Sequence, residues 1–159
     1  PADDRPLRAG DVLMLDTGAV RDGDFCDFDR NYAIGPASDA ARRAHAALFA
    51  ATEAALAAAR PGLTARDLHR VLSEALRAAG AVPGGGRLGH GLGLTLTEWP
   101  SLLPEDDTLL RAGMVLTLEP GVEIAPGRVM VHEENIVLRA EGARLLSSRT
   151  PAELPELEA

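Results

Sequence analysis

Residues 7–19 read LRAGDVLMLDTGA, and residues 110–122 read LRAGMVLTLEPGV. The two stretches are identical at eight of thirteen positions, with a constant offset of 103 residues. A repeat of this kind indicates two related structural units, so we expect a fold built from two similar halves. The alignment places Asp16 over Glu119, and each half therefore offers a carboxylate at the same position.

Each repeated stretch opens a segment with the composition of a β-hairpin. Strand-forming residues dominate both segments, and a turn-forming pair interrupts each, Asp22-Gly23 in the first half and Pro126-Gly127 in the second. The predicted strands are residues 11–20, 25–35, 114–124 and 128–140.

Two helices are predicted between the hairpins, and we interpret both as core elements. Ser38 is placed to cap an alanine-rich helix that runs until Pro61-Gly62 breaks it. Thr64 with Asp67 resembles a capping box that starts a second helix, which Gly80 ends. The apolar residues of the second helix have the spacing of one buried face and are Leu68, Val71, Leu72, Ala75 and Leu76.

Each hairpin carries a second acid on its other strand. Asp27 follows Asp16 by 11 residues, and Glu133 follows Glu119 by 14. If the halves pack about a pseudo-twofold axis, these four carboxylates converge on one face of a sheet. Two unit charges about 4 Å apart repel by roughly 4 kcal/mol at an effective dielectric constant of 20. Such a cluster must protonate, spread apart or bind cations, whereas isolated strand-end acids would stay solvated.

A histidine framed by glycines is the candidate imidazole ligand. His90 lies in the run LGHGLG (88–93), where glycine on both sides lets the backbone come close to whatever the ring binds. His45 and His69 lie on the predicted helices and are interpreted as structural. Oxygen and imidazole ligands together suit Mn, Fe, Co or Zn.

Composition bounds the remaining expectations. The 159 residues are 46% hydrophobic, which suits one globular domain. A net charge of −8 argues against a nucleic-acid or anionic-membrane surface. No run of about 18 apolar residues and no basic, apolar leader are visible, so we expect a cytoplasmic protein without a membrane span.

The single cysteine, Cys26, excludes an internal disulfide, and strand alternation turns it and His132 away from the acids.

In combination, these motifs resemble the M24 metallopeptidase superfamily, which includes methionine aminopeptidases, Xaa-Pro peptidases and creatinase. The matching segments are LMLDTGAVRDGDFCDFDR (13–30), GHGLG (89–93), MVLTLEPG (114–121) and HEENIVL (132–138). The resemblance runs from about residue 7 to residue 150. It implies the α+β "pita-bread" fold, with a curved antiparallel sheet, helices on its outer face and an internal pseudo-twofold repeat.

Carried over residue by residue, the resemblance implies two divalent metal ions, drawn from Mn, Co, Fe or Zn. The implied ligands are Asp16, Asp27, His90, Glu119 and Glu133, of which Asp27 and Glu133 bridge both metals. Spacing from Glu141-Gly142 favours Glu133 over Glu134 as the last ligand. The catalytic residues are then His90 and Glu119, and Glu119 would pass a proton from the nucleophile to the leaving nitrogen.

The chain departs from the peptidase pattern at two places. Thr97-Glu98-Trp99-Pro100 stands where the peptidases have His-Glu-x-Pro, so Thr97 and Trp99 are expected to form the substrate side of the site. A threonine offers a hydroxyl group but nothing that titrates near neutral pH. Asp29 stands where the family has threonine or serine before the arginine, here Arg30. It shares a predicted strand face with Asp27, where it could crowd the metals, but we favour its pairing with an arginine.

The predicted function is a dinuclear-metal-dependent hydrolase that cleaves a C–N bond, of the Xaa-Pro dipeptidase or aminopeptidase type. Its substrate would be a small peptide or small-molecule amide, and the resemblance is compatible with a homodimer. Two alternatives stay open: a creatinase-like small-molecule hydrolase or lyase, and a non-catalytic pita-bread binding module. Because the family's catalytic domain extends further N-terminally, we expect residues 1–159 to form one catalytic domain that lacks its N-terminal part, with an exposed sheet edge.

Overall fold

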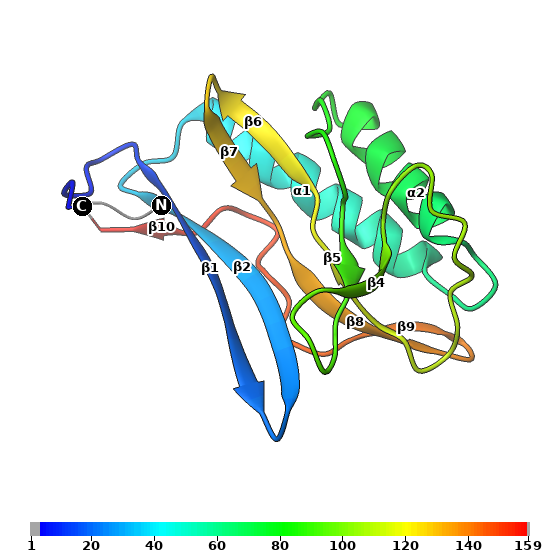
Figure 1. Ribbon diagram of the computed structural model, residues 1–159. Coiled ribbons are helices and arrows are strands. Elements are labelled where there is room, and N and C mark those ends of the chain that lie inside the picture. The colour runs from blue at the N-terminus through cyan, green and yellow to red at the C-terminus, as the bar shows by residue number, and fades with distance from the viewer. Residues whose placement is uncertain (1–3, 159) are drawn as a thin grey trace.

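The computed structural model describes residues 4–158, which form two helices and a set of mostly antiparallel strands (Figure 1). In chain order the elements are β1 (Val12–Arg21), β2 (Asp24–Ile34), α1 (Asp39–Ala58), α2 (Ala65–Ala78), β3 (His90–Gly91), β4 (Glu98–Ser101), β5 (Val115–Leu118), β6 (Gly121–Ala125), β7 (Arg128–Val131), β8 (Glu134–Arg139), β9 (Gly142–Leu145) and β10 (Glu156–Leu157).

The strands of the described residues form three sheets. Their orders are β1-β2-β10, β4-β3-β5-β8-β9 and β6-β7. All pairings are antiparallel except that of β10 with β2. In Figure 1 the two helices lie together on one side of the strands, where α1 contacts β6, β7 and β9, while the β1–β2 hairpin projects away. The predicted α+β architecture with helices on the outer face is confirmed.

The first hairpin forms as predicted. Its turn residues Asp22 and Gly23 both have positive φ angles, 54° and 98°, as a two-residue turn matched to the strand twist requires. The register pairs Asp16 with Asp29 and Gly18 with Asp27. Because side chains alternate along a strand, Asp27 and Asp29 share one face of β2.

The second hairpin is present but divided, which the sequence pattern did not predict. β5 pairs with β8 inside the five-stranded sheet, whereas β6 and β7 form a separate ribbon that closes at Pro126-Gly127. The strands break at Glu119-Pro120 and at His132-Glu133. Proline has no N–H for a ladder, and the Glu119 N–H donates to the carbonyl of Leu88, 2.9 Å away, outside the hairpin. The two predicted glutamate ligands therefore lie at the break.

The helices begin and end close to the predicted residues. The Ser38 hydroxyl accepts the N–H of Ala41 at 3.2 Å at the start of α1. Thr64 and Asp67 form the capping box of α2, and Gly80, with φ 76°, follows its end. The face of α2 that enters the core contains the fully buried side chains Leu68, Leu72 and Leu76. None of the helices formed by residues 4–158 is long and apolar enough to cross a membrane.

The two repeats differ in their surroundings. β5 lies between β3 and β8, whereas β1, its counterpart in the repeat, pairs only with β2 among the described strands. Most of β1 is exposed, including the apolar side chains of Leu15 and Val20. Among the described strands, β1 is therefore an exposed sheet edge.

Candidate metal centre

His90 lies on β3, between β4 and β5 of the five-stranded sheet, and has a glycine on either side. Gly89 has φ 146°, and a Cβ atom there would overlap the carbonyl oxygen of Thr117. A Cβ atom on Gly91 would lie 2.6 Å from the carbonyl oxygen of Trp99. In the structure, these glycines allow close packing against the backbone of β4 and β5, which the prediction had assigned to the group that the ring binds.

The imidazole of His90 is oriented as a metal-binding histidine would be. Nδ1 lies 2.8 Å from the carbonyl oxygen of Gly91, which assigns the ring proton to Nδ1. Nε2 then carries the free lone pair, and it lies 3.8 Å from Asp27 Oδ2 and 3.8 Å from Glu119 Oε2. A metal-ligating histidine typically donates its other N–H to a carbonyl or carboxylate in this way.

Acidic oxygens surround this nitrogen. One possible ligand atom from each of Asp27, His90 and Glu133 lies within 4.8 Å of the other two. Asn135, on β8, locks this arrangement by accepting the N–H of Asp27 at 3.4 Å and donating to the carbonyl oxygen of the same residue. Sequence reasoning missed Asn135, although its place two residues after Glu133 in the motif was a usable signal.

The surroundings of these acids disfavour their charged forms. Burial, followed by the charges of Asp27 and Glu119, raises the pKa of Glu133 to about 9. Burial is also the first cause that raises the pKa of Glu119 and of Asp27, with Asp16 contributing to both. Within residues 4–158, Glu119 Oε2 and Glu133 Oε1 are buried without a hydrogen-bond donor. Buried acceptors without donors fit a cation.

Asp16 occupies the outer edge of the cluster. Its side chain is exposed on β1, yet its charge contributes to the raised pKa values of Asp27, Glu119 and Glu133. The structure therefore brings the five predicted ligand residues to one region, with His90 and Glu133 at the buried end and Asp16 at the solvent end.

The neighbours of Glu133 have different partners. Glu134 accepts the Thr150 N–H at 2.9 Å and forms a salt bridge with Arg30 at 3.2 Å. The ring of His132 stacks on that of His45, with centroids 5.7 Å apart, and its Nε2 lies 3.7 Å from Oε1 of Glu134. Cys26 borders, with Asp16 and Asp27, a cavity lined by consecutive residues of β1 and β2.

The expected pairing of Asp29 with an arginine is wrong. Arg30 donates to the backbone carbonyl oxygens of Asp29, at 2.6 Å, and Glu133, at 2.9 Å, and forms its salt bridge with Glu134. The carboxyl group of Asp29 is only 2% exposed, and burial, with the charges of Asp16 and Glu119, raises its pKa to about 7.

The predicted substrate-side residues lie near the surface. Thr97 is exposed, and Trp99 is 70% exposed with its indole N–H donating to the Thr108 hydroxyl at 3.0 Å. In the described part of the chain, neither side chain has a hydrogen bond or ion pair with the acids. Leu96, which sequence reasoning missed, instead lines a cavity of about 360 Å³ with Asp16 and Asp27.

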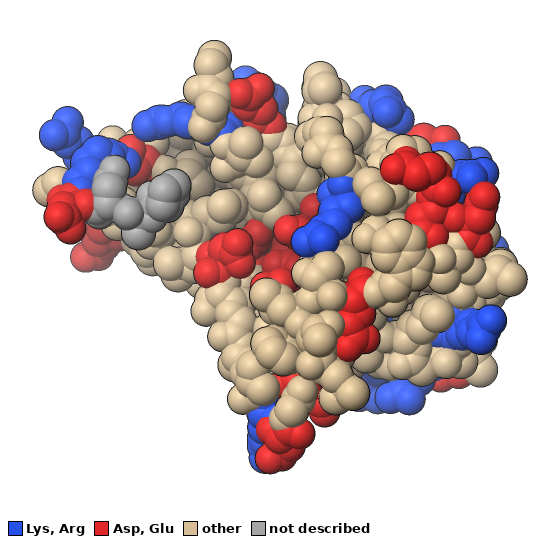
Figure 2. Space-filling view, viewed as in Figure 1, with Lys and Arg blue, Asp and Glu red and all other residues tan. Residues whose placement is uncertain are grey.

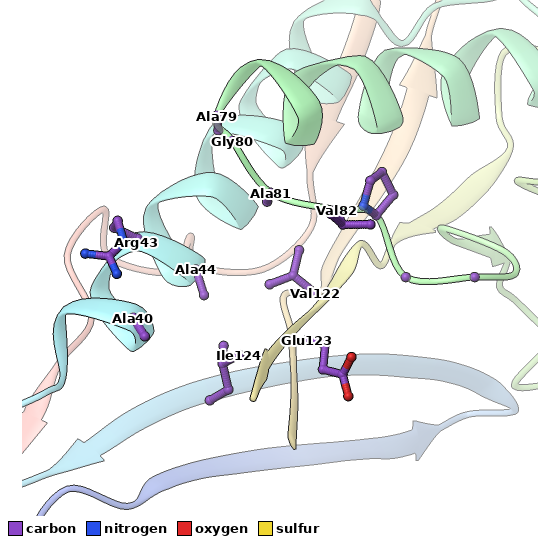
Figure 3. Close-up of a pocket in the computed structure, with 13 residues that line it drawn as sticks. Ala40, Arg43, Ala44, Ala79, Gly80, Ala81, Val82, Val122, Glu123 and Ile124 are labelled. Carbon is purple, nitrogen blue, oxygen red and sulfur yellow. The ribbon is translucent and has the colours of Figure 1, made fainter. Parts of the chain in front are cut away.

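Cavity size alone does not point to this site. A larger cavity, of about 620 Å³, lies between α1, the loop after α2 and β6 (Figure 3). Its charged lining residues are Arg43 and Glu123, and none of the clustered acids borders it. Figure 2 shows acidic side chains sunk into the middle of the face that Figure 1 presents, beside a basic group.

The fold and the clustered acids define a metallopeptidase-type domain, and comparison with known proteins agrees. The family model of metallopeptidase family M24 matches residues 1–141, and the chain belongs to this family. The predicted M24 resemblance is thereby confirmed, and the similarity to solved structures of relatives confirms the predicted fold.

Three relatives illustrate the similarity. The Xaa-Pro dipeptidase of Pyrococcus furiosus is 33% identical over 158 residues, which cover 96% of this chain and 44% of that protein. The dipeptidase PepE structure from Mycobacterium ulcerans has a TM-score of 0.91 at 34% identity, covering 99% of this chain and 43% of that one. The X-Pro aminopeptidase structure from Thermotoga maritima has a TM-score of 0.89 at 32% identity, with 98% and 44% covered. The chain thus spans less than half the length of these relatives.

Proposed function

We propose that this protein is a dinuclear-metal-dependent peptidase that hydrolyses the bond before proline in small peptides. The observation that carries the proposal is the free Nε2 of His90, which lies 3.8 Å from carboxylate oxygens of both Asp27 and Glu119. The names of the relatives, Xaa-Pro dipeptidase and X-Pro aminopeptidase, support the substrate class.

Five side chains would hold the two divalent cations, Mn, Co, Fe or Zn. They are Asp16, Asp27, His90, Glu119 and Glu133. The donor set fits, because oxygen and imidazole ligands suit these metals and two buried carboxylate oxygens have no donor in the described residues. When bound, the cations would polarise the substrate carbonyl group and activate water for attack near neutral pH.

Glu119 would move the proton. Its Oε2 is buried without a donor, so it can accept the proton of the nucleophile and release it to the leaving nitrogen. Burial raises the pKa of Glu119 above its ordinary value, which moves the group toward the range in which a carboxyl group can act as both base and acid. Glu119 also borders a cavity of about 390 Å³, where a substrate could reach it.

One residue favours a second candidate function. Thr97 occupies the position of the peptidases' substrate-facing histidine and is exposed. A creatinase-like hydrolase or lyase acting on a small-molecule amide would suit a site whose substrate wall has changed in this way.

The test begins with metal analysis of the purified protein, followed by assays with Mn²⁺ or Co²⁺ against Xaa-Pro dipeptides, with Ala-Leu as the non-proline control. The proposal expects about two metal ions per chain and cleavage of proline substrates that a chelator abolishes. Two bound metals without any proline cleavage would favour the creatinase-like alternative. Fewer than one tightly bound ion after supplementation would support a non-catalytic module.

A further inference from the structure

Asp29 is a buried acid for which the proposed mechanism has no role. It lies two residues after Asp27 on the same face of β2, and its backbone is directly opposite Asp16 on β1. The side chain is only 2% exposed, which is rare for an aspartate without a cationic partner.

The partners of its carboxylate are unusual. The backbone N–H of Glu133 hydrogen-bonds to it, but Oδ1 is buried without any partner among the described residues. The adjacent Arg30 gives its guanidinium to the carbonyl oxygens of Asp29, Glu133 and Ser148 and to the carboxylate of Glu134. No arginine hydrogen bond therefore reaches this carboxylate in the described structure.

The Asp29 side chain lies on the same face of β2 as Asp27, a member of the acidic cluster. The charged groups that act unfavourably on Asp29 are Asp16 and Glu119, and Asp29 in turn acts on Glu133. These three are proposed metal ligands, and one oxygen of the buried Asp29 carboxylate, Oδ1, has no hydrogen-bond partner among the described residues.

We propose that Asp29 is a sixth residue of the metal centre, a positioning residue that holds the Glu133 backbone and supplies an additional negative charge for the cations. The inference rests on the proposed metal site. Four ligand carboxylates would balance two divalent cations, and Asp29 makes the centre anionic overall. Outer groups of this kind tune metal affinity by fixing and polarising the ligands.

Asp29→Asn tests the inference because asparagine keeps the shape and an acceptor for the Glu133 N–H while removing the charge. Asp24→Asn, an exposed change of equal charge on the same strand, is the matched control. Isothermal titration of the chelator-treated, purified protein with Mn²⁺ should show affinity weakened by roughly 10- to 100-fold for Asp29→Asn and unchanged for Asp24→Asn.

Thermal melting separates this role from a purely structural one. At pH 8, removing a buried charge from among other acids should raise the Tm of the metal-free protein and reduce the further rise that Mn²⁺ produces. A structural role would lower both melting temperatures. Asp29→Thr, which also removes the charge, takes the place of Asp29→Asn if that variant does not fold.

The outcomes are distinct. Mn²⁺ affinity equal to wild type in the folded charge-removing variant overturns the role of Asp29 while the proposed function stands. A wild-type protein that does not bind Mn²⁺ overturns both. Weakened affinity together with a raised metal-free Tm supports the proposal.

Discussion

Nε2 of His90, on β3, lies 3.8 Å from Oε2 of Glu119, which lies outside the strands in the break between β5 and β6. The approach is set by the backbone, because the Glu119 N–H donates to the carbonyl oxygen of Leu88 at 2.9 Å, two residues before the histidine. The acid is thus attached to the segment that carries the imidazole, and this pair is the basis of the first two predictions.

Replacing His90 by alanine should remove metal binding. The imidazole is the one nitrogen ligand proposed. Its loss should therefore weaken metal affinity by more than the roughly 10- to 100-fold typical of residues that only hydrogen-bond to a ligand. The measurements are the metal content after dialysis and the rate of Xaa-Pro cleavage. His69→Ala, on α2, is the control and should retain both. Full metal loading of His90→Ala would contradict the ligand assignment.

Glu119→Gln should separate proton transfer from metal binding. With saturating Mn²⁺ or Co²⁺, we expect kcat to fall by about 10²- to 10⁴-fold because the amide cannot accept the proton. Metal content must be measured on the same sample, since Glu119 is also a proposed ligand. Full turnover by this variant with both metals bound would contradict the role of Glu119 in proton transfer.

Gly89→Ala should damage the site through the backbone. The added Cβ atom would overlap the carbonyl oxygen of Thr117, and φ 146° is unfavourable for alanine, so β3 must shift and carry His90 with it. We expect a lower Tm and weakened Mn²⁺ binding. Gly85→Ala, with nothing within 4 Å of the new atom, is the control. Equal behaviour of the two variants would contradict this reading.

The stability of the chelator-treated protein should fall as pH rises. The folded state raises the pKa of Glu133 to about 9 and of Asp29 to about 7, above the ordinary values of 4.5 and 3.8. The unfolded chain therefore releases these protons first, and the stability present below about pH 4 is lost as pH rises through the folded pKa values. One pKa unit is worth about 1.4 kcal/mol, so Tm should drop by several degrees between pH 5 and 9.

Two controls define this pH experiment. Glu133→Gln removes the most strongly shifted group and should flatten the profile. Saturating Mn²⁺ should oppose the fall, because cations bind the deprotonated acids and compete with protons. A metal-free Tm that is constant or rises over this range would show that the acids are not held protonated.

Thr97→His should show whether this residue faces the substrate. The side chain is exposed, so the larger ring should be accommodated without loss of stability. If the substrate passes it, Xaa-Pro turnover should rise and follow an ionisation near pH 6.5. Thr97→Gln, which adds bulk without a titrating group, is the control. Unchanged kinetics in both variants would contradict contact between residue 97 and the substrate. They would favour a substrate position beside Leu96.

Local signals predicted the local structure well. The Thr64 and Asp67 capping box and the Asp22-Gly23 turn each depend on residues within a few positions of one another, so the sequence contains the whole cause. The division of the second hairpin was not predicted, because Glu119 hydrogen-bonds to Leu88, a residue far away in the chain.

The sequence by itself determined which acids could form a site, because the repeat aligns Asp16 with Glu119. Tertiary structure alone decided the environment of each acid. Asp29 was expected to pair with an arginine, but the neighbouring Arg30 bonds to Glu134, and Asn135 anchors Asp27 from a distant strand. Burial and hydrogen-bond partners come from segments that meet only in the folded chain, and they decide which oxygens stay unpartnered and able to bind a cation.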